Sequence, residues 1–546
     1  MNEDERFEKL NWEMFQKILD KNPHYATFFG LHDPYDKLMP DGSSKNVFES
    51  LELMKQWLDR AKKTIKYDSL KDENKTDWKI LESAYELSKF SAEQHRTWET
   101  NPDAFDEMGG VLFIMFTRDY APLEKRVEAI IARLEGLPAY LDQFRTRFEK
   151  SKPVELWTRV ALESCQQIPG LVQFIVMATK GAIPAELHNR LTKTAMNLQQ
   201  PMQQHMKWLQ NLSSKTKTDW ALGKDKFETL LKLRKLGMTS DQIHQIGAKY
   251  LKELKEERAK LAHKIAPDKT IEEVMKQIEA KAPKSFEDAL KATQEEMERS
   301  RKFIIDHDLA TIPKEDQLLV VETPPFMAPL IPFAALIPPG KFDKKQIGIY
   351  VVTRPKDLAN LGKHLNFATI PSTAVHEGFP GHFLQGAVSN RHSFVRLFAG
   401  GTETIEGWAH YCEEMMTEHG FISSLESQFM KVNGTIWRAV RIIVDVKLSR
   451  GEMTFDEAVD MLMKEAGMSK EGAVAEVSRY TLTPGYPLSY LLGKHMILQL
   501  RDEIKKRMGK KFSEKFFHDT ITANGEISIA LLREVFDMKL AEMGIK

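Results

Sequence analysis

Apolar residues recur at three- and four-residue spacings from about residue 5 to about residue 310, and this periodicity constrains the fold more than any other feature of the sequence. The pattern is clear in Phe227–Leu233 and in Ile243–Leu251. Such spacing gathers apolar side chains on one face of an α-helix, while the interleaved Lys and Glu residues cover the opposite face. The same period resumes after Pro371 and continues to the C-terminus. The sequence therefore predicts a mainly α protein built from many packed helices.

A shorter region, between about residues 311 and 356, has a different pattern. Gln317–Val321 and Ile347–Val352 are short runs rich in β-branched residues and flanked by Pro and Gly, which predicts a small β-sheet. With 546 residues, the chain also exceeds what one hydrophobic core usually supports. We therefore expect a helical N-terminal subdomain, residues 1–310, and a second subdomain, residues 311–546, which holds the strands and the histidine segments described below.

The charge balance and the cysteine content exclude several classes of partner and location. Lys plus Arg and Asp plus Glu both total 78, so no net charge would attract nucleic acid or anionic lipid. The most apolar stretch, residues 324–339, contains six prolines, which argues against a membrane-spanning helix. Cys165 and Cys412 are too few for a disulfide framework, and Met1–Arg6 is acidic and lacks the pattern of an export signal. We expect a cytoplasmic protein with no nucleic-acid or membrane partner.

The segment around His376 carries the clearest chemical signal. In a common zinc-peptidase motif two histidines lie four residues apart on one helix face, and the glutamate beside the first is placed to activate a water at the metal. Glu377 fits that glutamate, but His382 follows His376 by six residues and would lie about 120° away on a regular helix. Pro380 removes a backbone donor and Gly381 permits unusual dihedral angles. We therefore expect a bulge that returns His382 to the metal side.

A second polar segment lies at Thr404–Glu414, in which Glu406 follows His382 by 24 residues. Its helical pattern places Glu406, His410 and Glu413 on one face. That face could bring one acidic ligand and two supporting groups to the same point, because carboxylates behind the ligands commonly fix the tautomer of ligating histidines. The alternative interpretation is a solvated acidic helix. The His376 segment beside it favours a metal site.

The string His376–Gln385 resembles the signature of the bacterial and archaeal family known as domain of unknown function 885, which is regarded as a branch of the gluzincin metallopeptidases. Glu406–Tyr411 also resembles the third-ligand segment of aminopeptidase N-type enzymes. The resemblance implies that Glu406 is the third ligand of one zinc ion per chain, beside His376 and His382. It also implies a large multi-helix gluzincin-like body with a small β-sheet beside the metal-binding helices. The likeness continues at Arg438, Arg441, Asp445, Arg479, Tyr480, Pro484, Gly485, Ser489, Tyr490, Gly493 and, weakly, Ala26, Thr27 and Gly30.

A three-ligand zinc site leaves one position open to water, and Glu377 would act as the catalytic base. Tyr490 is the predicted donor to the developing oxyanion, followed by Tyr480 and Tyr486, which we also assign to substrate binding. The alternative for each tyrosine is a half-buried packing role. Arg479 could bind a substrate carboxylate, or it could pair with a helix carboxylate.

These features predict a zinc-dependent peptidase, a hydrolase that cleaves short peptides with a metal-activated water. The alternatives are a metal-dependent hydrolase of non-peptide amides or esters and a catalytically inactive helical scaffold that binds metal. Ile347–Val352 could act as an edge strand that pairs with an extended peptide, or it could belong to a purely structural sheet. Arg441 and Asp445, four residues apart, predict an intrahelical ion pair.

Overall fold

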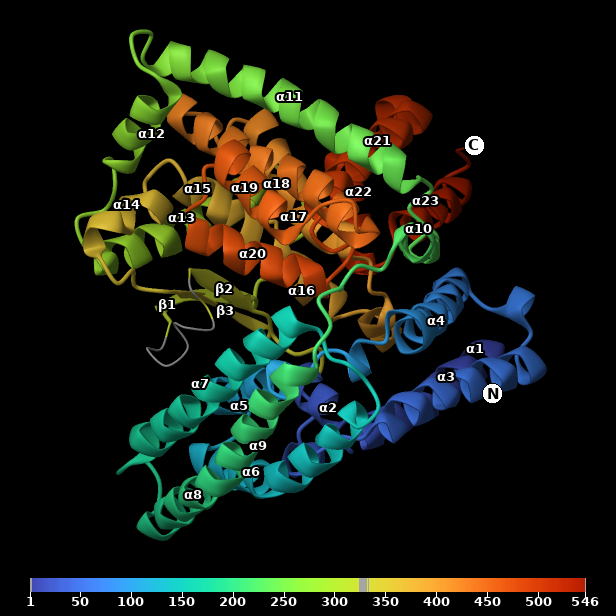
Figure 1. Cartoon of the computed structure of the whole chain (residues 1–546). Helices are drawn as coiled ribbons and strands as arrows, with labels where there is room; N and C mark the ends of the chain where they lie inside the picture. Colours follow the sequence, from blue (N-terminus) through green and yellow to red (C-terminus); the bar gives the residue numbers. More distant parts are fainter. Residues whose placement is uncertain (1, 324–330, 332, 546) are drawn as a thin grey trace. The chain divides into compact units, whose positions relative to one another are not determined.

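The chain forms two compact units, seen in a computed structural model that describes residues 2–323, 331 and 333–545 (Figure 1). The N-terminal unit comprises Met1–Trp220 and Gly340–Lys344, and the C-terminal unit comprises Ala221–Pro339 and Lys345–Lys546. The predicted mainly α fold is confirmed. The predicted division at residue 310 falls inside the C-terminal unit, because the helices between residues 224 and 306 pack against later helices and strands of that unit.

The N-terminal unit is a set of amphipathic helices closed over an aromatic core. Phe7 stacks on Trp78 with ring centroids 5.5 Å apart, and Trp57 donates its indole N–H to Asn11 at 3.0 Å. Asn2 starts the first helix with a reciprocal capping box with Glu5, which satisfies free backbone donors. The helices of this unit are α1 Glu3–Lys21, α2 Pro23–Phe29, α3 Ser44–Thr64, α4 Asp72–Phe90, α5 Asp106–Thr117, α6 Leu123–Arg145, α7 Glu155–Thr179, α8 Ala185–Asn197 and α9 Gln199–Leu212.

The C-terminal unit is organised around a long, largely buried helix, α18, along which α11 packs (Figure 1). Thr239 and Thr454 begin α11 and α19 with capping boxes, and Gly451 and Gly467 end α18 and α19 in the left-handed region that favours glycine. The helices of this unit are α10 Lys224–Leu233, α11 Ser240–Ile265, α12 Ile271–Glu279, α13 Phe286–Asp306, α14 Leu361–His364, α15 Ile370–Thr373, α16 His382–Ser389, α17 Thr402–Glu418, α18 Leu425–Arg450, α19 Phe455–Ala466, α20 Lys470–Leu482, α21 Ser489–Met508, α22 Glu514–Asn524 and α23 Ile529–Glu542.

The predicted strands are confirmed, and they belong to a three-stranded sheet in the C-terminal unit. Its strands are β1 Gln317–Glu322, β2 Ala334–Ile337 and β3 Ile347–Val352, in the order β1-β3-β2. β3 pairs in parallel with β1 and antiparallel with β2. The prediction that β3 could serve as an edge strand is therefore wrong, because neighbours occupy both of its sides. β1 and β2 form the edges of the described sheet.

Residues 324–330 and 332, which include four of the six prolines in the apolar stretch, lie outside the described residues. Within the described part of the chain, no helix has the length and apolar character needed to cross a membrane.

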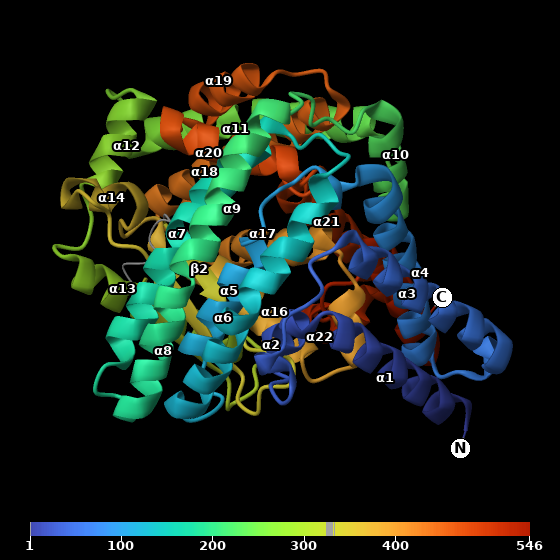
Figure 2. The same cartoon turned by 60° about the horizontal axis from the view of Figure 1, so that its bottom comes forward.

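The sheet packs beside the helix that begins at His382. Gly348 of β3 lies so close to Phe383 that a Cβ on the glycine would sit 2.5 Å from the phenylalanine ring. Phe383 is fully buried there. In the same unit, α16 also packs against α22 (Figure 2). These contacts anchor the start of α16 on a rigid support.

A second close approach joins α17 to α21. A Cβ on Gly493 would lie 2.1 Å from the carbonyl oxygen of Glu403, and a Cβ on Gly407 would lie 2.4 Å from the backbone of Gly493. Real side chains do not tolerate such distances, so the two helix backbones can cross here only because both positions are glycine. The crossing lies beside Glu406 and one helical turn after Tyr490.

Gly493→Ala should force α17 and α21 apart and lower the free energy of unfolding by roughly 1–3 kcal/mol, the usual cost of overpacking a core. Chemical denaturation measures this loss. Gly386→Ala is the matched control, because a Cβ at Gly386 meets nothing within 4 Å and alanine favours the helix by about 1 kcal/mol. Equal stability of the Gly493 variant and the parent protein would contradict the crossing.

Candidate metal centre

The backbone between His376 and His382 leaves the regular helix. α15 runs into a π-helical turn at Ala374–Gly378, in which the amide of Phe379 donates to the carbonyl of Ala374 at 3.2 Å. The peptide bond between Phe379 and Pro380 is cis, and α16 begins afresh at His382. The expected distortion thus takes the form of a wide turn followed by a chain reversal, which brings the second histidine back beside the first.

Gly381 permits this reversal for a steric reason. Its φ of −67° is an ordinary value, so left-handed backbone freedom is not what the position requires. A Cβ at Gly381 would lie 1.9 Å from the carbonyl oxygen of His376, which leaves no room for any side chain. The amide of Gly381 donates to Val375 at 3.0 Å, and the indole of Trp408 on α17 donates to the carbonyl of Pro380 at 2.8 Å. The turn is therefore held from within and from the neighbouring helix.

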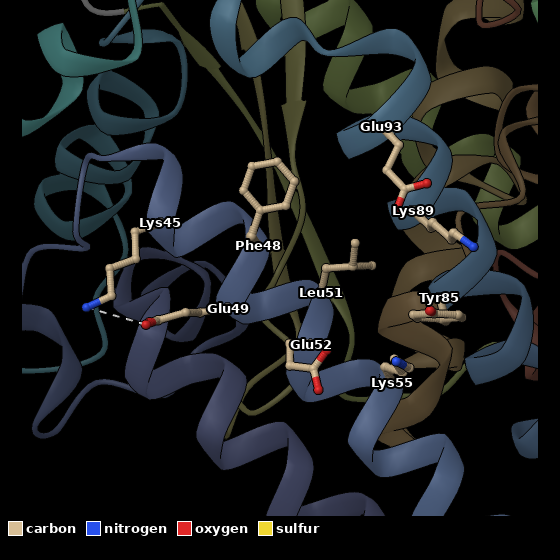
Figure 3. Close-up of a pocket in the computed structure, with 9 residues that line it drawn as sticks. All are labelled: Lys45, Phe48, Glu49, Leu51, Glu52, Lys55, Tyr85, Lys89 and Glu93. Carbon is tan, nitrogen blue, oxygen red and sulfur yellow. Dashed lines mark ion pairs between the residues drawn. The ribbon is translucent and has the colours of Figure 1, made fainter.

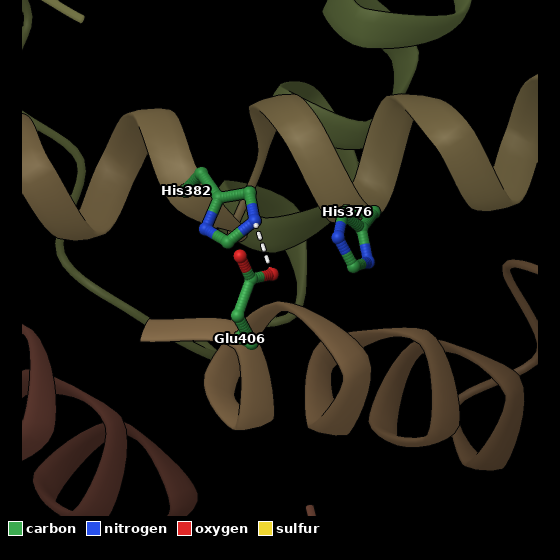
Figure 4. A group of neighbouring side chains, drawn as sticks. All are labelled: His376, His382 and Glu406. Carbon is green, nitrogen blue, oxygen red and sulfur yellow. Dashed lines mark ion pairs between the residues drawn. The ribbon is translucent and has the colours of Figure 1, made fainter. Parts of the chain in front are cut away.

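The reversal brings the three predicted ligands together (Figure 4). One ligand atom from each of His376, His382 and Glu406 lies within 4.8 Å of the others. The two imidazole rings are nearly perpendicular with centroids 4.8 Å apart, and His382 Nε2 lies 3.3 Å from a carboxylate oxygen of Glu406. Two ligands of a tetrahedral zinc ion with bonds of about 2.0–2.1 Å stand roughly 3.3 Å apart, so this donor set and spacing fit zinc.

The predicted supporting groups lie behind His376. One oxygen of Glu413 lies 2.8 Å from Nδ1 of His376 and 3.3 Å from Nδ1 of His410. Burial would raise the pKa of Glu413, but the neighbouring His410 and the hydrogen bond with His376 outweigh it and hold that pKa well below its usual range. An ionised carboxylate only accepts, so His376 carries its proton on Nδ1 and offers Nε2 to a metal.

Glu377 follows the first ligand directly and is half-buried. Its charge acts on two neighbours: it favours the protonated form of His382 and helps burial to raise the pKa of Tyr350 on β3. Burial lowers the pKa of His382, but the hydrogen bond with Glu406 and the surrounding carboxylates outweigh it and raise the pKa to about 9. Glu377 therefore lies within electrostatic reach of both His382 and the sheet residue Tyr350.

Two tyrosines lie next to Glu406: Tyr486, in the loop before α21, contacts it directly, and Tyr490, in the first turn of α21, packs against Tyr486. Tyr486 donates its hydroxyl to Glu406, and the Tyr490 ring meets the Tyr486 ring edge-on with centroids 6.1 Å apart. Asp445 of α18 holds this loop, because it accepts the amides of Gly485 and Leu488 at 2.9 and 3.0 Å. Loop and ligand are thus linked directly.

The intrahelical pair predicted for Arg441 and Asp445 is wrong. Arg441 pairs instead with Glu476 of α20 at 3.0 Å, and its Nε donates to the hydroxyl of Tyr480 at 2.8 Å. Both side chains of the predicted pair are buried. Asp445 accepts the two loop amides and the hydroxyl of Ser449 on its own helix at 3.1 Å, and Arg441 finds its polar partners on α20. A spacing of four residues on one helix does not decide the pairing here, because a buried charge requires hydrogen bonds and other elements supply them.

Arg479 and Tyr480 differ in their access to a substrate. Tyr480 is 1% exposed and its hydroxyl is engaged by Arg441 and by the indole of Trp437, so the predicted substrate contact does not fit it. Arg479 pairs with Glu476 at 2.8 Å, while 41% of its side chain remains exposed. The structure thus assigns Tyr480 a packing role and leaves Arg479 open on one side.

Glu526 is a neighbour of the centre that sequence reasoning missed. It follows the turn after α22, and its charge acts on both His382 and Glu406. Its side chain is exposed to solvent, yet the protein that surrounds the carboxylate raises its pKa. Glu526 lies 120 residues after Glu406 in the sequence, and a single glutamate after an Asn-Gly turn carries no signal that could have identified it.

A surface hollow of about 600 Å³ lies elsewhere, between α3 and α4 of the N-terminal unit (Figure 3). No residue of the metal centre lines it. Its charged side chains are balanced between lysines and glutamates, and Lys45 pairs with Glu49 at 3.5 Å. Nothing in this lining selects a ligand by charge or offers a group for catalysis.

Glu413→Gln should weaken zinc binding by about tenfold or more, because loss of the charge behind a ligating histidine typically costs 10–100-fold in affinity. Competition with a chromogenic zinc chelator measures the affinity. Glu418→Gln serves as the control on the same helix, since Glu418 pairs with Arg501 at 2.7 Å and is 42% exposed. Unchanged affinity in the Glu413 variant would show that this carboxylate does not orient His376.

Comparisons with known proteins give a family and two solved structures with the same fold. Residues 23–536 match the family described as bacterial protein of unknown function (DUF885). A "putative lipoprotein of unknown function" from Shewanella oneidensis shares the fold with a TM-score of 0.79 and 21% identity, covering 97% of this chain and 99% of that one. A "putative lipoprotein" from Colwellia psychrerythraea shares it with a TM-score of 0.85 and 19% identity, covering 99% and 100%. No curated protein matches the chain. The chain therefore belongs to the DUF885 family.

Proposed function

We propose that this protein is a zinc-dependent peptidase of the gluzincin type that hydrolyses short peptides. The observation that carries the proposal is the convergence of His376, His382 and Glu406. A further carboxylate that is not one of these three, Glu377, directly follows His376 and acts electrostatically on His382. A metal held only for stability needs its ligands, whereas an additional carboxylate beside them is what general base catalysis requires. The ordered carboxylate behind His376 supports the same conclusion, since it fixes the ligand in its metal-binding tautomer.

Each side chain of the centre has a defined task in such a reaction. Bound zinc would supply the Lewis acidity that polarises a peptide carbonyl and acidifies water. Glu377 takes the proton of the attacking water and passes it to the leaving amine nitrogen. Tyr490 donates its hydroxyl to the oxyanion that develops on the carbonyl, because a phenol can donate without carrying charge. Tyr486 holds Glu406 in its binding orientation.

Glu377→Gln should retain zinc at one ion per chain and lose peptide hydrolysis by at least about a hundredfold, the usual contribution of a general base. His382→Ala should lose both zinc and activity. Metal analysis of the purified variants and cleavage of a random short-peptide mixture, followed by mass spectrometry, measure the two properties separately. Undiminished hydrolysis in a zinc-loaded Glu377→Gln protein would remove this mechanism.

The same assays separate the alternatives. If the parent protein cleaves simple amides or esters and leaves every peptide intact, the site is a hydrolase of another substrate class. If the parent protein holds zinc and hydrolyses none of these substrates, the centre is a structural scaffold.

Tyr490→Phe and Tyr486→Phe distinguish the two phenols of the centre. Tyr490→Phe should lower kcat by about a hundredfold with little change in KM or zinc affinity, because it removes a donor used only in the transition state. Tyr486→Phe should mainly weaken zinc binding, because it releases Glu406. The reverse assignment of these two effects would make Tyr486 the donor to the oxyanion.

We also propose a cytoplasmic location. Cys165 and Cys412 are buried and free, as is usual in a reducing compartment. Two solved structures with the same fold carry the description "putative lipoprotein", so membrane attachment is the competing hypothesis. Fractionation of the producing cells should recover the protein with the soluble contents, and recovery with membranes would contradict the proposal.

A further inference from the structure

Three arginines gather at one end of the candidate metal centre and form what we call the arginine cluster: Arg438 and Arg441 of α18 and Arg479 of α20. The guanidinium of Arg441 lies over the Trp437 and Tyr490 rings at 4.0 and 4.4 Å. That of Arg438 lies 5.0 Å from the Trp437 ring and 6.0 Å from the Tyr490 ring. Tyr490 therefore has guanidinium groups on its face and the Tyr486 ring at its edge.

The positive charge of the arginine cluster is only partly neutralised. Arg441 and Arg479 share one oxygen of Glu476, at 3.0 and 2.8 Å. Among the described residues, no carboxylate forms an ion pair with Arg438, which donates to the carbonyl of Gly434 on its own helix at 3.1 Å. The buried Nε of Arg438 has no hydrogen-bond partner among the residues that the structure describes. The three guanidinium groups thus have one carboxylate among them. Burying unpaired positive charge costs free energy, and an anion bound at the cluster would offset this cost.

The three members of the cluster differ in mobility and access. Arg441 is 3% exposed and is held by Tyr480 and Glu476, so it acts as a fixed charge that positions its neighbours. Arg438 is half-buried, and 41% of the Arg479 side chain is exposed. These two can therefore reach a ligand, and planar guanidinium groups are the side chains best suited to bind a carboxylate.

The cluster lies close to the atoms that would do the chemistry. The charges of Arg441, Arg479 and Arg438 act on Tyr490, and so does the charge of the ligand Glu406. Arg479 also acts on Tyr486, whose hydroxyl is bonded to Glu406. Contacts also link the two regions: Tyr486 bonds to Glu406 and meets the Tyr490 ring, and the guanidinium groups of Arg441 and Arg438 lie over that ring.

We propose that Arg438 and Arg479 bind a carboxylate of the substrate, with Arg441 as the positioning residue. The inference rests on the proposed function, to which it adds the substrate class: peptides that present a carboxylate near the bond to be cleaved. That carboxylate is either the free C-terminus or the side chain of Asp or Glu, since a guanidinium recognises both in the same way.

Three libraries of N-acetylated random tripeptides test the proposal: free acids, C-terminal amides without Asp or Glu, and C-terminal amides with one Asp or Glu. Affinity is measured by calorimetry on the zinc-loaded Glu377→Gln protein, so the result does not depend on turnover. We expect the free acids to bind about tenfold or more tightly than the plain amides, as hydrogen bonds to charged groups imply. Tighter binding of the acidic amides instead would identify the side-chain carboxylate as the source.

Arg479→Gln and Arg438→Gln, added to that protein, should each reduce the preference for the carboxylate by about tenfold while leaving affinity for the plain amides unchanged. Arg533→Gln is the control, because Arg533 is an exposed arginine of α23 paired with Glu503 at 3.0 Å. Arg479→Lys should restore part of the preference. Equal affinity for all three libraries, absence of binding, or variants that lose affinity for acids and amides alike would overturn the proposal.

The inference and the proposed function fail in different ways. Carboxylate-selective binding without hydrolysis by the parent protein would retain the arginine site and remove the peptidase. If the parent protein binds the acids and amides with equal affinity and hydrolyses them at equal rates, the peptidase proposal stands and the arginine site is removed.

Discussion

The close approach of Gly381 to the carbonyl of His376 is the constraint on which the candidate metal centre depends. Six residues separate the two histidines, and a regular helix would point them in different directions. The π-turn and the chain reversal correct this, but only because position 381 carries no side chain. Trp408 then holds the reversed chain from α17, the helix that also supplies Glu406. The turn before α16 and the indole of Trp408 thus determine whether the three candidate ligands lie close together.

α17 shows how one helix can serve a site at several depths. Glu406 lies with His376 and His382 as a candidate ligand, Trp408 donates to the carbonyl of Pro380 in the turn, and Glu413 lies behind His376. The residues between them are buried as well, so the helix has no solvated face in this region. The buried charges of Glu406 and Glu413 are tolerated because each carboxylate has imidazole or hydroxyl partners. These hydrogen bonds offset the loss of hydration on burial.

Much of this arrangement could be predicted from the sequence, because it depends on local pattern. Helical periodicity, β-branched runs and the spacing of His376 and His382 can be recognised within short segments, and the resemblance to a known family implied Glu406 as the third ligand. The remainder depends on partners distant in the chain. Arg441 pairs across to α20, and β3 becomes the central strand because Ala334–Ile337, hidden in a proline-rich stretch, pairs with it. Glu526 reaches the site through folding alone. Nothing in the sequence near these residues indicates which distant partner each of them will contact in the fold.

The glycine crossing of α17 and α21 has a further consequence. Glu406 directly precedes Gly407, and Tyr490 precedes Gly493 by three residues, so the ligand and the phenol each belong to a backbone in van der Waals contact with the other. Because α17 and α21 are in contact at these glycines, neither helix can shift without moving the other. The fold itself therefore fixes the spacing between the backbones that carry Glu406 and Tyr490, and the proposed reaction would need little reorganisation of these two side chains.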